Sequence, residues 1–179
     1  MVARQTSELG PSDLATLRSK VALASVLKDD HVQLPEARAL GEEAAAGLVA
    51  QLGDGHEDAL RVQTVLAQML EATHEFDQAQ TLYAGMVEQL TRLFGVEDDR
   101  TLRVKRHLAG LFCKVGKLQT ARKLYEEVER LQSASLGDTH PESLLTRGSL
   151  AVLLMRLDGD ADREAGREML EQVALAYEK

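Results

Sequence analysis

A repeated spacing runs through the chain and constrains its fold more than any other feature. The pair Leu-Ala recurs at Leu23-Ala24, Leu66-Ala67, Leu108-Ala109 and Leu150-Ala151, in steps of 43, 42 and 42 residues. An apolar residue followed by glycine recurs in the same steps, at Leu9-Gly10, Leu52-Gly53, Phe94-Gly95 and Leu136-Gly137. Because two unrelated markers keep one register, the sequence predicts four tandem copies of a unit about 42 residues long.

Other columns of the repeat agree with this register. They hold apolar or small residues, namely Leu17, Leu60, Leu102 and Leu144; Ala37, Ala79 and Ala121; and Tyr83 with Tyr125. The fourth copy fits only if about three extra residues, Asp158-Gly159-Asp160, lie in its middle. We place these residues in the turn between two helices, and we expect Leu66, Leu108 and Leu150 to lie in the core.

Each copy reads as two helices joined by a short turn. In the third copy, Val104, Leu108, Leu111 and Val115 follow the spacing of one helical face, and a second stripe begins at Leu118. A very short turn forces the two helices to run antiparallel. The predicted helices lie near 12–29, 34–51, 56–73, 76–93, 98–115, 118–135, 140–157 and 162–178.

Several residues are typical of helix ends. Thr139 and Glu142 match a capping box, and Pro141 suits a first helical turn. The glycine after each apolar marker suits a helix C-terminus. These signals support the predicted boundaries, most clearly in the fourth copy.

Composition favours helices as well. Strong helix formers are abundant, whereas aromatic residues make up only 3% of the chain, too few for a typical β-sandwich or barrel. The sequence therefore predicts an all-α fold, a right-handed α-solenoid of four helix–turn–helix repeats with eight antiparallel helices. We expect a lead-in at 1–8 and a single repeat domain at 9–179, with repeats near 9–51, 52–93, 94–135 and 136–179.

The repeat resembles a known family. The run Leu136-Gly137-Asp138-Thr139-His140-Pro141-Glu142-Ser143-Leu144, followed by Leu150-Ala151, is similar to the 42-residue tetratricopeptide repeat of the kinesin light chains. The second copy matches through Leu52-Gly53-Asp54-Gly55-His56-Glu57 and Tyr83. HEAT repeats share the period, but the chain has no pattern that matches them. The resemblance implies an adaptor that binds peptides or domains in a concave groove.

One departure from the family concerns how cargo is held. Kinesin light chains carry an Asn pair before the Leu-Ala column, and these amides contact the backbone of the bound peptide. Here the four places hold Val21-Ala22, Thr64-Val65, Arg106-His107 and Gly148-Ser149. The chain lacks that amide ladder, so we do not expect it to bind kinesin cargo in the same way.

Positive charge gathers in the third copy. Residues 100–123 hold eight basic and no acidic residues, although the whole chain has a net charge of −8. In the tetratricopeptide register, Arg103, Arg106, His107 and Lys114 face the groove. Arg61 and Arg18 hold the place of Arg103 in the second and first copies, whereas the fourth has Leu145 there with Arg156 nearby. The partner-binding residues that we expect are Arg18, Arg61, Arg103, Arg106, His107, Lys114 and Arg156. The alternative is a solvated basic surface.

The histidines do not form a metal-binding pattern. His56 and His140 share one repeat column, which favours turn or helix-cap positions. His74 is followed by Glu75 as in a metalloprotease helix, but Gln78 stands where the second histidine is needed. His31 lies in a predicted turn and is expected to be solvated. We expect no metal and no cofactor.

Catalytic residues are also not expected. Cys113 lies six residues after His107, too far along a helix for the imidazole to reach the sulfur. The chain shows no Ser-His-Asp arrangement and no phosphate-binding glycine loop. We therefore expect a protein without enzymatic activity, although a helical enzyme is the third function considered.

Composition also bears on partners and compartment. The acidic balance disfavours nucleic acid, and the longest apolar run, Leu150–Met155, is too short to cross a bilayer. A single cysteine and the absence of an apolar segment in the first ten residues favour the cytoplasm or another reducing compartment, with organelle import left open.

The function that we expect is a scaffold whose concave face binds an acidic segment of a partner protein, because guanidinium groups pair well with carboxylates. The alternative is a structural subunit of a larger assembly, held through its convex face or terminal helix. The last helix carries Met169, Leu170, Val173 and Tyr177. We expect more chain, a second copy or a partner to cover these residues.

Overall fold

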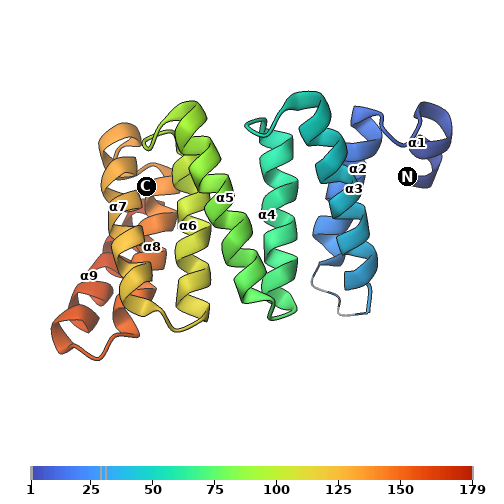
Figure 1. Ribbon diagram of the computed structural model, residues 1–179. Coiled ribbons are helices and arrows are strands. Elements are labelled where there is room, and N and C mark those ends of the chain that lie inside the picture. The colour runs from blue at the N-terminus through green and yellow to red at the C-terminus, as the bar shows by residue number, and fades with distance from the viewer. Residues whose placement is uncertain (1, 29, 31, 179) are drawn as a thin grey trace. The chain divides into compact units, whose positions relative to one another are not determined.

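The computed structural model describes residues 2–28, 30 and 32–178. Within these ranges the chain forms nine α-helices and no strand (Figure 1). The helices are α1 (Val2–Leu9), α2 (Leu14–Leu27), α3 (Leu34–Leu52), α4 (Glu57–Ala72), α5 (Phe76–Phe94), α6 (Asp99–Lys114), α7 (Leu118–Leu136), α8 (Pro141–Met155) and α9 (Asp160–Tyr177). The all-α prediction is confirmed, and α2 to α9 are the eight helices expected from the repeat.

Helix α1 was not expected, because the sequence has no apolar stripe there. None of its residues is buried. An ion pair one turn apart, from Arg4 Nε to Glu8 Oε1 at 2.8 Å, supports the helix locally. The spacing of these two residues was the available signal in the sequence.

The helix starts follow the repeat register. Asp13, His56, Asp98 and His140 are the N-caps of the four first helices, and each side chain accepts a hydrogen bond from the backbone N–H two residues later. The two histidines are therefore cap residues, as predicted. The capping box of Thr139 was wrong, because His140 Nδ1 accepts from Glu142 N–H at 3.2 Å. Pro141 occupies the first turn, as expected.

The helix ends follow the register too. Gly53 and Gly137 are the C-caps of α3 and α7, with φ of 82° and 92°. Glycine adopts this left-handed backbone region without a steric penalty, so the chain can leave the helix there. The glycine marker of the sequence therefore has the role predicted for it.

The chain divides into two compact units, Met1–Gln89 and Leu90–Lys179, with the boundary inside α5. In the first unit α2 packs on α3, and both contact α4. Its core holds Leu17, Ala24 and Leu48 among others. Tyr83 of α5 is fully buried and donates a hydrogen bond from its hydroxyl to Glu71 Oε1 at 3.0 Å. Burial is the main cause that raises the pKa of Tyr83, and the nearby Glu71 carboxylate adds to it.

In the second unit α6 packs on α7, both contact α8, and α9 packs on α8. The core around Ala109, Tyr125 and Leu150 joins α6, α7 and α8, and Met169 of α9 packs against it. A smaller cluster combines Leu102 of α6 with two residues of α7.

The columns of the repeat behave as predicted, except that Leu23 and Leu66 of the Leu-Ala pairs are only half-buried. The alanines Ala24, Ala67, Ala109 and Ala151 are all fully buried, as are those of the second column, Ala37, Ala79 and Ala121. Leu108 and Leu150 are buried, whereas Leu66 is only half-buried and packs at the edge of a core cluster. The buried stripe of α4 is centred on Val62, Val65 and Met69, which leaves Leu66 beside it.

Candidate protein-interaction surface

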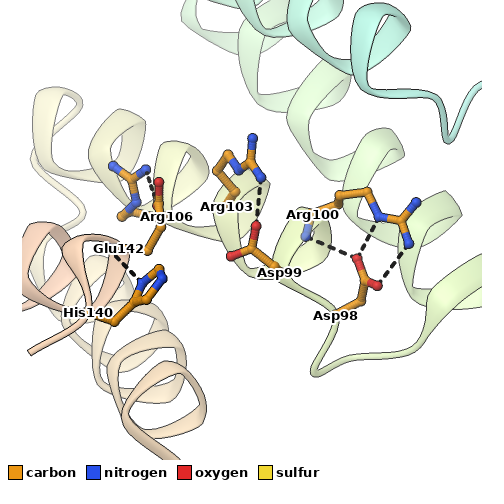
Figure 2. A network of polar contacts seen from close by, with 7 residues as sticks. All are labelled: Asp98, Asp99, Arg100, Arg103, Arg106, His140 and Glu142. Carbon is orange, nitrogen blue, oxygen red and sulfur yellow. Dashed lines mark hydrogen bonds and ion pairs between the residues drawn. The ribbon is translucent and has the colours of Figure 1, made fainter. Parts of the chain in front are cut away.

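A row of arginines lies along the first half of α6, at Arg100, Arg103 and Arg106 (Figure 2). Arg100 donates from Nε and Nη2 to the two oxygens of Asp98, at 2.8 and 2.9 Å. The same guanidinium lies 3.4 Å from the centre of the Phe94 ring. The hydrogen bonds from Arg100 are the largest cause that lowers the pKa of Asp98. Arg100 is thus paired with Asp98, the N-cap of its own helix.

The next two arginines are also paired with carboxylates. Arg103 Nη2 lies 2.6 Å from Asp99 Oδ2, one turn earlier in the same helix. Arg106 Nη2 lies 3.1 Å from Glu142 Oε2 in the first turn of α8 (Figure 2). The contact from Arg106 therefore joins the third repeat to the fourth.

The first unit has a related arrangement. Arg18 Nε of α2 donates to Asp58 Oδ2 of α4 at 2.8 Å, and Arg61 Nη2 lies 3.8 Å from Asp58 Oδ1. Asp58 and Glu142 occupy the same repeat position, two residues after a histidine cap. In both units, a first-turn carboxylate thus receives an arginine of the preceding repeat.

A hollow of about 610 Å³ lies along α8 in the second unit, beside the C-terminal parts of α6 and α9. We call it the α6–α8–α9 hollow. Its lining is mostly apolar or small and comprises Gly110, Cys113, Lys114, Tyr125, Leu144, Leu145, Gly148, Ser149, Val152, Leu153, Arg156, Leu170, Val173 and Tyr177. Leu145, Val152 and Tyr177 are exposed to solvent although they are large and apolar. Such a concave apolar surface is typical of binding sites.

Two cations border this hollow. Lys114 is the last residue of α6, and Arg156 is the C-cap of α8, where partial negative charge on the helix ends favours a cation. Arg156 Nη2 donates to the Cys113 carbonyl at 3.3 Å, so it also joins the two helix ends. Burial raises the pKa of the Cys113 thiol, against the smaller opposite effect of Arg156. The thiol is therefore not activated as a nucleophile.

The seven residues expected to bind a partner are only partly brought together. Lys114 and Arg156 line the hollow, whereas Arg103, Arg106 and His107 lie earlier on α6 and do not line it. Arg18 and Arg61 belong to the other unit. A single groove that contains all seven residues stays a prediction.

Sequence reasoning missed the apolar wall of the hollow. On α8 this wall is formed by Leu145, Gly148, Ser149 and Val152, spaced along one helical face without a charge. That spacing was the available signal. Of the four apolar residues of the last helix that we expected to be covered, three line the hollow, namely Leu170, Val173 and Tyr177.

The remaining histidines take no part in a recognisable site. His74 has a positive φ of 61° in the turn before α5, and its ring meets the edge of Phe76. His31 lies outside the described residues. Across the described ranges, no group of three or more His, Cys, Asp or Glu side chains is placed to hold a metal ion. None of the helices within the same ranges is long and apolar enough to cross a membrane.

The arrangement of paired antiparallel helices in a 42-residue register defines a tetratricopeptide-like repeat fold. Comparison with solved structures agrees. The chain is similar to a protein from Podosopora anserina described as a kinesin light chain with nearly identical TPR-like repeats. The sequence identity is 27%, the TM-score 0.70, and the match covers 98% of this chain and 82% of the other. A single-residue variant of that protein gives a TM-score of 0.73, with 81% of it covered.

BtubC (BKLC) from P. vanneervenii has the same fold at 20% identity. Its TM-score is 0.75, and the match covers 98% of this chain and 70% of BtubC. No protein-family model matches the chain, and no curated protein matches it. The predicted resemblance to kinesin light chain-like repeats is thus confirmed by structural similarity.

Proposed function

We propose that this chain is a scaffold without catalytic activity. It binds an acidic segment of a partner protein on the side formed by the first helix of each repeat. The observation that carries the proposal is the α6–α8–α9 hollow, where Lys114 and Arg156 border an apolar wall. A partner segment could place an apolar side chain against Leu145 and Val152 and a carboxylate beside the two cations. Tetratricopeptide-like structural neighbours support a role in protein interaction in general.

Arginine suits this role because its planar guanidinium can bind a carboxylate through two hydrogen bonds. In the second unit the proposed surface comprises Arg103, Arg106, His107, Lys114 and Arg156. In the first unit, Arg18 and Arg61 are proposed to contact a partner on their own unit. Among these residues, Lys114 and Arg156 are exposed, whereas Arg103 and Arg106 are half-buried and contact carboxylates of the chain.

The test is a selection of peptide ligands. A displayed library of short random peptides is selected on the whole chain, and the affinity of the enriched peptides is measured by fluorescence anisotropy. We expect enrichment of Asp and Glu next to an apolar residue, and weaker binding at higher salt because salt screens exposed charges. The double variant Lys114→Glu with Arg156→Glu should abolish binding and keep the helix content, while the melting temperature falls only slightly because both cations lie at helix C-termini.

A matched control makes the same change of charge elsewhere. Lys123 and Arg130 are exposed on α7 and do not line the hollow. Arg122 is a poorer control, because it bridges Glu126 and Asp162. The variant Lys123→Glu with Arg130→Glu should bind as the wild type does. Equal losses in both double variants, or ligands that carry no acidic residue, would contradict the proposed site.

The alternative is a structural subunit held through its terminal helix. It is favoured by the exposure of two apolar residues near the end of α9, Leu175 at 59% and Tyr177 at 61%. The substitution Leu175→Glu separates the two functions, because Leu175 does not line the hollow. If the chain associates with itself or with a subunit through α9, this substitution should dissociate the complex in sedimentation. Peptide binding should stay unchanged.

A further inference from the structure

Asp58 and Glu142, each in the first turn of a helix, form ion pairs with arginines that were expected to bind a partner. Asp58 contacts Arg18 and Arg61, and Glu142 contacts Arg106. Each carboxylate stands two residues after a cap histidine, and the two positions are equivalent in the repeat. The carboxylate position is thus the same in both units, whereas the arginines that it contacts, Arg18 and Arg106, hold different repeat positions. In the third repeat, the corresponding place is held by Arg100, which pairs with its own cap Asp98.

Each of these contacts has the chemistry that an acidic ligand would offer. A carboxylate oxygen of Glu142 lies 3.1 Å from the guanidinium of Arg106. Glu142 keeps 30% of its side chain exposed, against 13% for Arg106. The carboxylate is therefore the more accessible member of the pair. A negatively charged segment that approaches Arg106 from solvent meets a like charge before it meets the arginine.

We propose that Glu142 competes with the acidic partner for Arg106 and so sets the affinity of the surface in the second unit. This inference rests on the proposed function. It assigns Glu142 a role in partner choice: a ligand binds Arg106 only if its own acidic groups displace Glu142. Ligands with one weakly placed carboxylate are rejected, and ligands with several are accepted.

A carboxylate of the ligand can replace the carboxylate of Glu142 beside Arg106. Glu142 keeps 30% of its side chain exposed, so its carboxylate can turn to solvent when a ligand carboxylate replaces it beside Arg106. Glu142 also lies in the first turn of α8, where the partial positive charge of the helix N-terminus favours a carboxylate whether or not the arginine is bound. The charge of Arg106 stays paired in both states.

The opposite role is that Glu142 orients Arg106 for the ligand. The two roles predict opposite effects when the charge of Glu142 is removed. A competitor lowers affinity, so its removal strengthens binding. An orienting residue raises affinity, so its removal weakens binding.

The experiment uses Glu142→Gln, which keeps the length of the side chain and removes its charge. Its matched control is Glu168→Gln, which removes the same charge from an exposed position of α9 that does not line the hollow. The probe is a fluorescent hexaglutamate peptide, and its binding is measured by anisotropy at low salt. We expect Glu142→Gln to bind about two- to fivefold more tightly than the wild type, as the usual strength of such pairs implies. The control should bind like the wild type.

A second measurement needs no ligand. In NMR spectra, the exchange of the Arg106 Nη2 protons with water should be faster in Glu142→Gln than in the wild type, because Nη2 is the atom that contacts Glu142. An unchanged exchange rate would mean that Glu142 does not hold Arg106, and it would overturn the inference.

The remaining outcomes separate the two proposals. In one outcome, Glu142→Gln binds the peptide as well as the wild type or more weakly, while Lys114→Glu with Arg156→Glu loses binding. This result overturns the inference that Glu142 competes with the ligand, and it leaves the proposed function in place. If hexaglutamate binds neither the wild type nor Glu142→Gln, the proposed binding of an acidic segment is contradicted. The inferred competition by Glu142 is then contradicted as well.

Discussion

Gln132 of α7 and Thr146 of α8 form a buried hydrogen bond between the third and fourth repeats. Thr146 Oγ1 donates to Gln132 Oε1 at 2.6 Å, and both residues are fully buried. The Nε2 group of Gln132 is buried without a hydrogen-bond acceptor among the described residues. Two repeats earlier, the equivalent positions hold Leu48 and Val62, which pack in the same apolar cluster. The second unit thus places a polar pair where the first unit has an apolar one.

This difference predicts a non-additive pair of substitutions. Thr146→Val alone should lower the free energy of unfolding by about 1–3 kcal/mol, because it leaves Gln132 Oε1 buried without its donor. Adding Gln132→Leu should recover most of that loss or exceed it, since the pair then matches Leu48 and Val62. Urea unfolding of the single and double variants measures both effects. A double variant as unstable as Thr146→Val would show that the polar pair fits a shape that the apolar pair cannot fill.

The helix starts show how one role can be filled by two side chains. Asp13 and Asp98 cap α2 and α6 through a carboxylate oxygen, whereas His56 and His140 cap α4 and α8 through Nδ1. A neutral imidazole can accept a hydrogen bond at its unprotonated nitrogen, so both residue types satisfy a free backbone N–H of the first turn. The four cap residues therefore hold the same position in every repeat, although histidine does not belong to the usual set of cap residues.

Close packing of α9 on α8 depends on Gly166. A Cβ atom at Gly166 would lie 2.7 Å from the Ala151 carbonyl oxygen and 2.9 Å from Met155 Cγ. Gly166→Ala should therefore push α9 away from α8 and cost about 1–3 kcal/mol of stability. Thermal melts followed by circular dichroism measure this loss.

Gly85 of α5 is the matched control, because no atom lies within 4 Å of its expected Cβ. Gly85→Ala should stabilise the chain by up to about 1 kcal/mol, since alanine is the better helix former. A Gly166→Ala variant as stable as the wild type would mean that α9 can shift without loss of packing.

Charge is unevenly distributed along the whole chain. The net charge is −8, yet residues 100–123 hold eight basic residues and no acidic one. Several of these cations contact carboxylates from other segments, as Lys105 does with Glu127 and Arg122 with Asp162. Many of the basic side chains of this segment therefore form ion pairs within their own unit. Lys114 of this segment borders the hollow together with Arg156, and both are exposed.

Folding of the whole chain should need no metal ion. The histidines that suggested a ligand are cap or turn residues, at His56, His140 and His74. Thermal melts with and without a strong chelator should therefore superimpose. A large drop in melting temperature after chelation would reveal a structural metal, because metal binding energy adds directly to folding energy.

The sequence by itself determined the repeat period, the helices and the buried columns. These properties depend on spacing along the chain, and the alanines at Ala24, Ala67, Ala109 and Ala151 show the same full burial in every repeat. The glycine ends at Gly53 and Gly137 are local as well, because they follow from backbone geometry within one turn.

Only the tertiary structure decided which arginines are available to a partner. Arg18 contacts Asp58, and Arg106 contacts Glu142, across 40 and 36 positions of the sequence. Such contacts depend on how the first turn of one helix lies against the preceding repeat, which a repeat register does not specify. The α6–α8–α9 hollow has the same origin, because Tyr177 and Val152 line one hollow only when α9 folds back onto α8.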